Sequence, residues 1–365
     1  MKTILHIGMP KTGSTALQEC LRASRDQLAA NGVLYPANPP GCPFNNHRML
    51  VFGFTPYQRL PRHILRYDSY TEDNITEKYR EFLDGVAQQV QSQRPAVTIL
   101  SSETLFRSLR PEARRSLVEA LEPLGDEVRV AVYLRRPSEF YLSNIQQILK
   151  QSHDLGWLRV RATFDPVRTY AETFGRDAVA VRTYARNALV DGDIVADFLA
   201  NHVTERPIDA TGLRRGRNQN ETVSAESMDL LRRHRLAFHA NANNVSKIDS
   251  AQLVGELRRC EKDAGAQKPR LRPEIADAID YSRNDPLRLR DAYGVIFPGL
   301  DYRRLERRPM RWLPRLPRRP KSLSELIFID TAVQRDILSR LRSSRWAKAE
   351  PARVSWIDGL MRELA

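Results

Sequence analysis

A short segment near the start of the chain combines the residue types that bind a phosphate group. An apolar run at residues 3–7 is followed by a loop that contains Lys11 and Gly13, and then by the hydroxyl pair Ser14-Thr15. The apolar residues that come next recur at helical spacing, which predicts a strand, a loop and the first turn of a helix. Free amides and the dipole at a helix N-terminus attract anions. Together with the charge of Lys11, this pattern predicts a phosphate-sized anion site.

The loop differs from a nucleoside-triphosphate P-loop in the place of its lysine. Gly8 and Gly13 have the spacing of G-x-x-x-x-G-K-[ST], but the lysine lies inside the loop. Residues 10–15, PKTGST, resemble the 5′-phosphosulfate loop of sulfotransferases that use 3′-phosphoadenosine 5′-phosphosulfate (PAPS). The resemblance implies cofactor contacts from Lys11, Thr12, Gly13, Ser14 and Thr15. The alternative is an ordinary strand–turn–helix with an unrelated lysine.

A second segment extends the resemblance. Residues 128–134 are apolar and β-branched, which is typical of a buried parallel strand, and they lead into Arg135-Arg136-Pro137. Ser143 follows Arg135 by eight residues, on the helix predicted next. The same sulfotransferases have an arginine at the end of such a strand and a serine eight residues later. The resemblance implies that Arg135 and Ser143 bind the 3′-phosphate of the cofactor, whereas each alone would be read as solvated surface.

A catalytic base is expected where a third strand ends. Residues 97–100 form a short apolar run that leads to Glu103. Ligands bind beyond the carboxyl ends of parallel strands, so Gly8, Glu103 and Arg135 are expected at one edge of the sheet. Related sulfotransferases have a histidine or a glutamate as base, which makes Glu103 the first candidate; the alternative is that it caps a helix or pairs with an arginine. His47, in a polar loop, is a second candidate for the base or for contact with the acceptor.

A late basic sequence, residues 214–217, is loosely similar to the Arg-Lys-Gly loop that closes over the 3′-phosphate in cytosolic sulfotransferases. The resemblance implies that Arg217 is a lid contact, and solvated surface is the alternative.

The histidines and cysteines predict neither a metal site nor a disulfide framework. We expect no histidine to pair with a carboxylate at ligand spacing, and the three cysteines are isolated, with no C-x-x-C motif. Isolated cysteines fit a reducing cytoplasm. The apolar part of the first residues is too short for a secretory signal, and no apolar run approaches the roughly 18 residues of a membrane helix. The expected localisation is therefore cytoplasmic.

The charge of the chain points to anionic partners. Its 365 residues carry a formal net charge of +14, with 41% hydrophobic and 28% charged residues. Such a surplus attracts polyanions, which include the cofactor itself and, as one alternative, a polyanionic glycan as acceptor. No sequence motif of a specific nucleic-acid-binding module is visible. A very basic, proline-interrupted run covers residues 303–321.

Strand and helix patterns alternate along the first 200 residues, which predicts an α/β fold with a parallel sheet between helices. The strands are expected at 97–100, 128–134 and 178–182, besides the first, and a single helix at 272–291. Strand signals thin out later. We therefore predict a PAPS-binding, P-loop-like core at 1–204, a helical continuation at 205–302, and a basic linker with C-terminal helices at 303–365.

These patterns lead to one functional expectation: a PAPS-dependent sulfotransferase of bacterial type, acting on an acceptor hydroxyl of a carbohydrate without a required metal. The resemblance covers residues 1–200 with specific motifs and the rest weakly. Two alternatives stay open. A P-loop kinase would need a lysine directly before the last Ser/Thr and an aspartate for Mg²⁺. A non-catalytic polyanion-binding protein would explain the charge but not the loop.

Overall fold

The computed structural model describes residues 1–60, 70–156, 160–216, 222–307 and 319–364. The chain forms two compact units whose segments alternate along the sequence. The sheet unit consists of Met1–Arg136, Ala162–Asn218 and Asn284–Tyr302, and the helical unit of Pro137–Arg161, Gln219–Arg283 and Arg303–Ala365. This division differs from the three consecutive regions expected from the sequence, because the chain leaves the sheet unit after Arg136 and returns to it twice.

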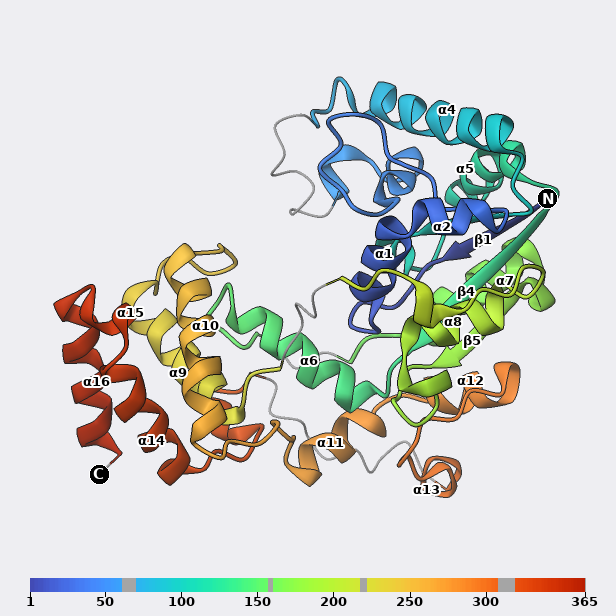
Figure 1. The fold of residues 1–365 in the computed structure, drawn as a ribbon. Coiled ribbons are helices and arrows are strands. Elements are labelled where there is room, and N and C mark those ends of the chain that lie inside the picture. Colours follow the sequence, from blue (N-terminus) through green and yellow to red (C-terminus); the bar gives the residue numbers. More distant parts are fainter. Residues whose placement is uncertain (61–69, 157–159, 217–221, 308–318, 365) are drawn as a thin grey trace. The chain divides into compact units, whose positions relative to one another are not determined.

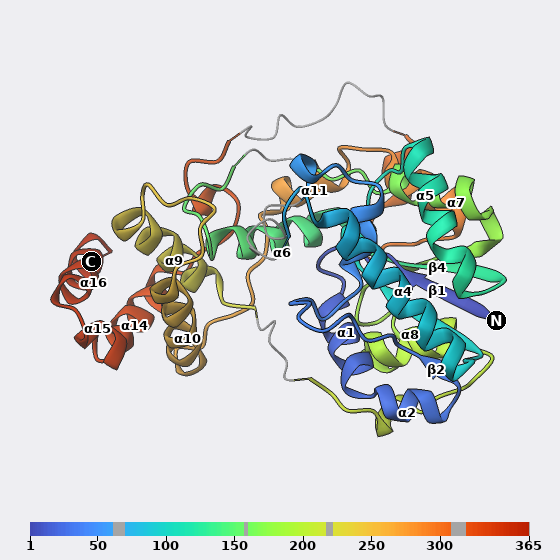
Figure 2. The same ribbon diagram turned by 90° about the horizontal axis from the view of Figure 1, so that it is seen from above.

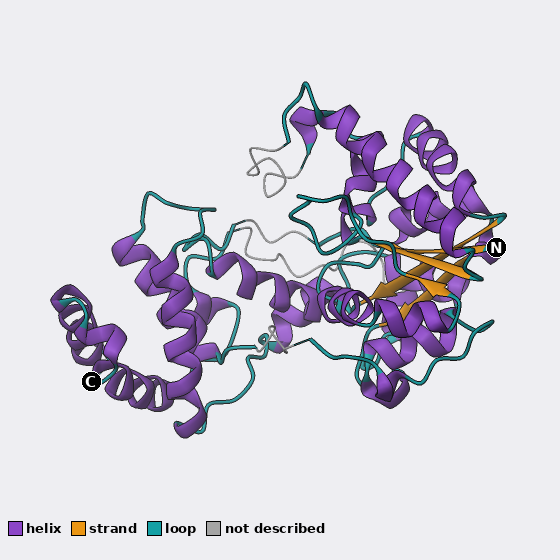
Figure 3. Ribbon diagram, turned by 45° about the horizontal axis from the view of Figure 1, so that its top comes forward, coloured by secondary structure: helices purple, strands orange, loops and turns teal. Residues whose placement is uncertain are grey.

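The sheet has five parallel strands in the order β2-β3-β1-β4-β5. Figure 3 shows the strands in orange among the helices that surround them. Their bounds are β1 Lys2–His6, β2 Val33–Leu34, β3 Val97–Ser101, β4 Glu127–Leu134 and β5 Val179–Thr183. In register, His6 at the end of β1 lies opposite Ser101 of β3 and Ala131 of β4. The chain moves from β1 toward β2 on one side and from β4 to β5 on the other. The carboxyl ends of β1 and β4 therefore flank the position where the topology reverses, which is where ligands bind in open α/β sheets.

Seven helices belong to the described part of the sheet unit (Figure 1): α1 Ser14–Ala23, α2 Arg25–Ala30, α4 Ile75–Gln93, α5 Pro111–Leu121, α7 Phe164–Phe174, α8 Ile194–His202 and α12 Asp285–Tyr293. Leu17 and Leu21 of α1 and Phe198 of α8 form one apolar cluster with Ile4 and Tyr133 of the sheet. Helix α7 contacts β4, β5 and α5. The long helix α4 (Figure 2) packs against the 3₁₀ helix at Arg48–Gly53. These helices cover the strands, whereas the loops that follow the strands lie at the carboxyl ends of the sheet.

The segment Asn284–Tyr302 completes the sheet unit from far along the chain. Asp285, at the start of α12, accepts hydrogen bonds from the backbone N–H groups of Thr163 (2.6 Å) and Phe164 (3.2 Å) at the start of α7. The guanidinium of Arg288 lies 3.8 Å from the centre of the Phe164 ring. A buried carboxylate thus supplies the acceptor that the first turn of α7 needs, since no residue of α7 itself caps it.

The helical unit has its own core, which is rich in leucine and isoleucine. Its helices are α6 Pro137–Leu149, α9 Ala225–Phe238, α10 Ile248–Asp263, α11 Pro273–Asp280, α14 Thr331–Arg342, α15 Arg345–Lys348 and α16 Pro351–Glu363; α13, Tyr302–Glu306, crosses the boundary between the units. Asp280 of α11 accepts from the N–H and the hydroxyl of Ser138, both at 2.8 Å, and so caps α6. No helix among these described residues is both long and apolar enough to cross a membrane.

The structure confirms the α/β class and the expected strands to within a residue or two. It corrects two details. The predicted helix at 272–291 is two helices, α11 and α12, since the chain turns at Ser282–Asn284 ahead of Pro286. The short edge strand β2 was not predicted, because two residues carry no periodic pattern. Most of the basic run at 303–321 lies outside the described residues.

A buried ion pair links the last strand to α8. Asp197 is fully buried and accepts two hydrogen bonds from the guanidinium of Arg182, at 2.6 and 2.7 Å. The Tyr133 hydroxyl donates to the same carboxylate at 2.7 Å, and the Val190 N–H at 3.0 Å. Burial alone would raise the pKa of Asp197, but these donors hold it below its usual range.

We predict that Asp197→Asn destabilises the sheet unit by about 3 kcal/mol, because it leaves the Arg182 charge without its buried partner. The exposed pair of Asp165 and Arg168 provides the control, and Asp165→Asn should cost less than about 1 kcal/mol. Urea unfolding followed by circular dichroism measures both. Since the folded pKa is lowered, the stabilisation is present at pH 7 and is lost below about pH 4. The difference in the free energy of unfolding between wild type and Asp197→Asn should therefore become smaller in acid. A difference that does not change with pH would contradict this account.

Candidate active site

The loop between β1 and α1 has an unusual backbone. Gly8, Lys11 and Gly13 have φ values of 59°, 71° and 77°, all in the left-handed region. The Thr12 side chain closes the loop, because its hydroxyl donates to the Met9 carbonyl oxygen at 2.6 Å. This hydroxyl is therefore used inside the loop, and any cofactor contact by Thr12 falls to its backbone. The structure thus has a compact loop directly before the first turn of α1.

The N-terminus of α1 is open. Gly13 is its N-cap residue, and no described side chain accepts from its first amides. Ser14 is buried and Thr15 is exposed, so the hydroxyl pair lies at the border between loop and solvent. An α-helix leaves its first N–H groups without intrahelical partners, and these groups with the helix dipole bind anions. The first turn of α1 therefore supplies the donors that the sequence predicted.

Tyr184 explains why the loop ends in glycine. A Cβ atom at Gly13 would lie 3.0 Å from Cε2 of Tyr184 and 3.2 Å from Cγ2 of Ile194. Tyr184 follows β5 directly, and its N–H donates to the Leu134 carbonyl oxygen at 2.7 Å. Sequence reasoning missed Tyr184; its place directly after a predicted strand was the available signal.

Arg135 connects the end of β4 to the loop. Its Nη1 donates to the carbonyl oxygen of Lys11 at 3.3 Å, and its guanidinium lies 5.8 Å from the centre of the Tyr184 ring. The neighbouring Arg136 donates to the Pro298 carbonyl oxygen at 3.3 Å. The Arg135 guanidinium thus contacts the backbone of Lys11, a residue far away in the sequence, at the carboxyl edge of the sheet.

Glu103 lies on the other side of the loop, at the start of the 3₁₀ helix Glu103–Leu105 after β3. A Cβ atom at Gly8 would come within 3.3 Å of the Glu103 Cβ, so the loop backbone passes close to this residue. The half-buried carboxylate accepts from Nε2 of Gln18 at 3.0 Å. Among the described residues Glu103 caps no helix and pairs with no arginine, so neither alternative reading of this residue is supported.

Gln18 belongs to a buried polar cluster that sequence reasoning missed. Its Nε2 also donates to the Ser101 hydroxyl at 3.0 Å, and its Oε1 accepts from Asn46 Nδ2 at 3.1 Å. Nδ1 of His6 lies 2.8 Å from the same hydroxyl. Burial lowers the pKa of His6 to about 3, so this ring is neutral. The cluster orients the Gln18 amide and with it the Glu103 carboxylate; its signal was a glutamine within the apolar stripe of α1.

His47 does not offer a free ring nitrogen. Its Nδ1 accepts from the Ser101 N–H at 3.0 Å, and its Nε2 lies 3.1 Å from the Pro36 carbonyl oxygen. Burial lowers its pKa to about 4. Both nitrogens join backbone segments, which argues against His47 as a base or an acceptor contact and assigns it to holding the end of β3.

Two further predicted cofactor residues belong to other segments of the chain. Ser143 is half-buried on α6 in the helical unit. Arg217 lies outside the described residues, although Gly216 beside it comes close to Glu19 of α1. Arg215 pairs with Asp193 at 2.9 Å. The roles of Ser143 and Arg217 toward a cofactor stay predictions.

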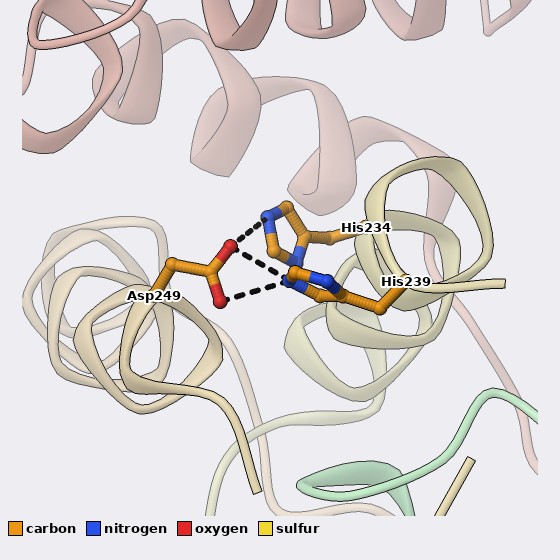
Figure 4. Close-up of side chains that lie close together, drawn as sticks. All are labelled: His234, His239 and Asp249. Atoms are coloured by element: carbon orange, nitrogen blue, oxygen red, sulfur yellow. Dashed lines mark hydrogen bonds and ion pairs between the residues drawn. The ribbon is translucent and has the colours of Figure 1, made fainter. Parts of the chain in front are cut away.

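The structure also corrects the expectation that no histidine pairs with a carboxylate. Nε2 of His239 lies 2.8 Å from Oδ2 of Asp249, and His234 lies beside them in the helical unit (Figure 4). The pairing was missed because it joins the end of one helix to the start of another across a loop.

We predict that Gly13→Ala destabilises the protein by roughly 2–4 kcal/mol, from the left-handed backbone and the contacts with Tyr184 and Ile194. Gly41→Ala is a matched control, since Gly41 has φ 80° but nothing within 4 Å of an added Cβ; it should cost only roughly 1–2 kcal/mol. Chemical denaturation measures both variants. Equal losses of stability in the two variants would show that the contact with Tyr184 places no constraint on the loop.

Around the carboxyl end of β1 the structure thus gathers a left-handed loop that contains Lys11 and an open helix N-terminus, with Arg135 on one side of the loop and Glu103 on the other. Comparisons of the chain with protein-family models, with curated proteins and with solved structures give no match.

Proposed function

We propose that the protein is a sulfotransferase that moves a sulfuryl group from PAPS to an acceptor hydroxyl, with a carbohydrate as the expected acceptor and no required metal. One observation carries the proposal: a left-handed loop with an internal lysine lies between an arginine after β4 and a carboxylate after β3. A group that donates hydrogen bonds to a phosphate and a candidate base are then on opposite sides of one loop.

The donor set fits a bound 5′-phosphosulfate. PAPS supplies an activated sulfuryl group on a phosphate leaving group. The first amides of α1 and the Lys11 ammonium offer fixed positive charge where charge grows on the leaving phosphate. Arg135 is the candidate partner of the 3′-phosphate, and Ser143 and Arg217 remain further candidates.

Glu103 is the candidate base. Its carboxylate would take the proton of the acceptor hydroxyl while the hydroxyl oxygen bonds to sulfur and the bond from sulfur to the phosphate oxygen breaks. The hydrogen bond from Gln18 holds one carboxylate oxygen at 3.0 Å, so the other is oriented rather than free to rotate. Such orientation of a general base lowers the entropy lost on reaching the transition state.

The first test of this function is cofactor discrimination. Adenosine 3′,5′-bisphosphate should bind at least roughly 10-fold more tightly than AMP, because charge-assisted hydrogen bonds to the 3′-phosphate contribute about 1.5–3 kcal/mol each. Arg135→Gln should remove most of the preference, measured by calorimetry. Arg129→Gln, at the exposed opposite end of β4, is the control and should retain it. Equal affinities, or tighter binding of Mg-ATP, would refute the cofactor assignment.

The second test addresses the base. A screen of hydroxyl acceptors with labelled PAPS first identifies a substrate. With that substrate, Glu103→Gln should lower kcat roughly 10²–10⁴-fold, since the amide keeps the shape but takes no proton. Binding of adenosine 3′,5′-bisphosphate should be unchanged, and Glu112→Gln, exposed in the first turn of α5, should be fully active. A Glu103→Gln enzyme of normal kcat together with an inactive but folded His47→Gln would move the base to His47.

A further inference from the structure

Two histidines and an aspartate meet in the helical unit, far along the chain from the loop of β1. Nε2 of His239 lies 2.9 and 2.8 Å from the two carboxylate oxygens of Asp249, and Nε2 of His234 lies 3.6 Å from Oδ2 (Figure 4). One ligand atom from each residue lies within 4.8 Å of the others. We propose that this cluster binds one divalent transition metal of the zinc class.

The buried state of His234 is the observation that favours a ligand over a simple ion pair. Its side chain is fully buried, and among the described residues neither ring nitrogen has a hydrogen-bond partner. Buried polar groups nearly always have a hydrogen-bond partner, so a ring nitrogen that lies 3.6 Å from a carboxylate oxygen without such a bond calls for an explanation. A metal ion between His234, His239 and Asp249 would accept the Nε2 lone pair, while Nδ1 remains among aromatic rings.

The pair of His239 and Asp249 can supply ligands without a change in the charge of the ring. When Nε2 of a neutral His239 gives its lone pair to the metal, the ring carries its proton on Nδ1, and the Asp249 carboxylate faces the metal in place of an Nε2 proton.

The backbone around the cluster is held in place before any metal arrives. His239 follows α9, Asp249 lies in the first turn of α10, and the buried Arg235 fixes the loop between them. Its Nη2 donates to the carbonyl oxygens of Gln151 and Ala242, both at 2.6 Å. The Ser250 N–H donates to Asp249 Oδ1 at 2.6 Å and orients the carboxylate. Groups that hydrogen-bond to the ligands of metal sites have the same effect.

The surroundings are apolar and carry little competing charge. The ring of His234 lies 4.8, 5.4 and 5.6 Å from those of Phe238, Trp346 and Trp356. The two nearby cations are occupied: Arg235 donates to the carbonyls described above, and Arg353 pairs with Glu350 at 2.9 Å. Two imidazoles and one carboxylate are ligands that Zn²⁺ accepts, with at least one position left for water. Ligand atoms of a tetrahedral Zn²⁺ lie roughly 3.3 Å apart, so only small movements of the three side chains are required.

Cobalt and zinc binding to the full chain test the site directly, with no need for sulfotransferase activity. Protein stripped with a chelator and dialysed should bind one equivalent of Co²⁺ with visible d–d absorption, and Zn²⁺ should displace it. His239→Gln and Asp249→Asn should each weaken binding roughly 100-fold or more, since even outer partners of metal ligands are worth 10–100-fold. His153→Gln, a half-buried histidine of the same unit outside the cluster, should bind normally.

A second readout guards against variants that fail to fold. Zn²⁺ at about 100-fold excess over its dissociation constant should raise the wild-type melting temperature by roughly 5 °C or more and leave Asp249→Asn unchanged, with circular dichroism confirming that both are folded. Wild-type binding no tighter than that of His239→Gln would overturn the proposal. A sulfur-to-cobalt charge-transfer band would overturn it as well, because it would place the metal on Cys20, Cys42 or Cys260 instead.

Discussion

The pairing of β1 with β3 on one side and β4 on the other is the interaction on which the proposed site depends. Because all strands are parallel, every loop that follows one of them leaves the same edge of the sheet. β4 continues past Ala131, the partner of His6, to Leu134, and this extra length brings Arg135 to the carbonyl of Lys11. A slip of one residue between β1 and β4 would turn His6 to the other face and separate the arginine from the loop.

A second constraint is the hydrogen bonding of two buried polar side chains beneath that edge. Gln18 bonds Ser101, Glu103 and Asn46, while His47 uses both of its nitrogens to join backbone segments. Partly satisfied networks are costly in a low-dielectric interior, whereas satisfied ones specify one arrangement. Removing Gln18 would therefore disturb the Glu103 carboxylate and the end of β3 together. The polar cluster and the loop are thus parts of one arrangement.

Local patterns predicted the strands and the loop, because apolar β-branched runs and a glycine before Ser14-Thr15 are visible over a few residues. The common edge of Gly8, Glu103 and Arg135 was expected from parallel strands, and the structure has the strand ends before these residues at one edge of the sheet. The contacts of Gln18 with Asn46 and of His239 with Asp249 were not predicted, since they join helices and loops whose packing no short window records. The same holds for Asp285, which caps α7 from more than a hundred residues away.

The return of Asn284–Tyr302 to the sheet unit has a consequence for synthesis on the ribosome. The carboxylate that caps α7 and the arginine over Phe164 are made long after β5. At the usual rates of translation, at least several seconds pass between the synthesis of β5 and the synthesis of Asp285 and Arg288. During that interval the first turn of α7 lacks its acceptor and the helical segments between are already emerging. A chaperone that recognises unfinished apolar surface would have its longest opportunity to bind at that stage, before residue 302 leaves the exit tunnel.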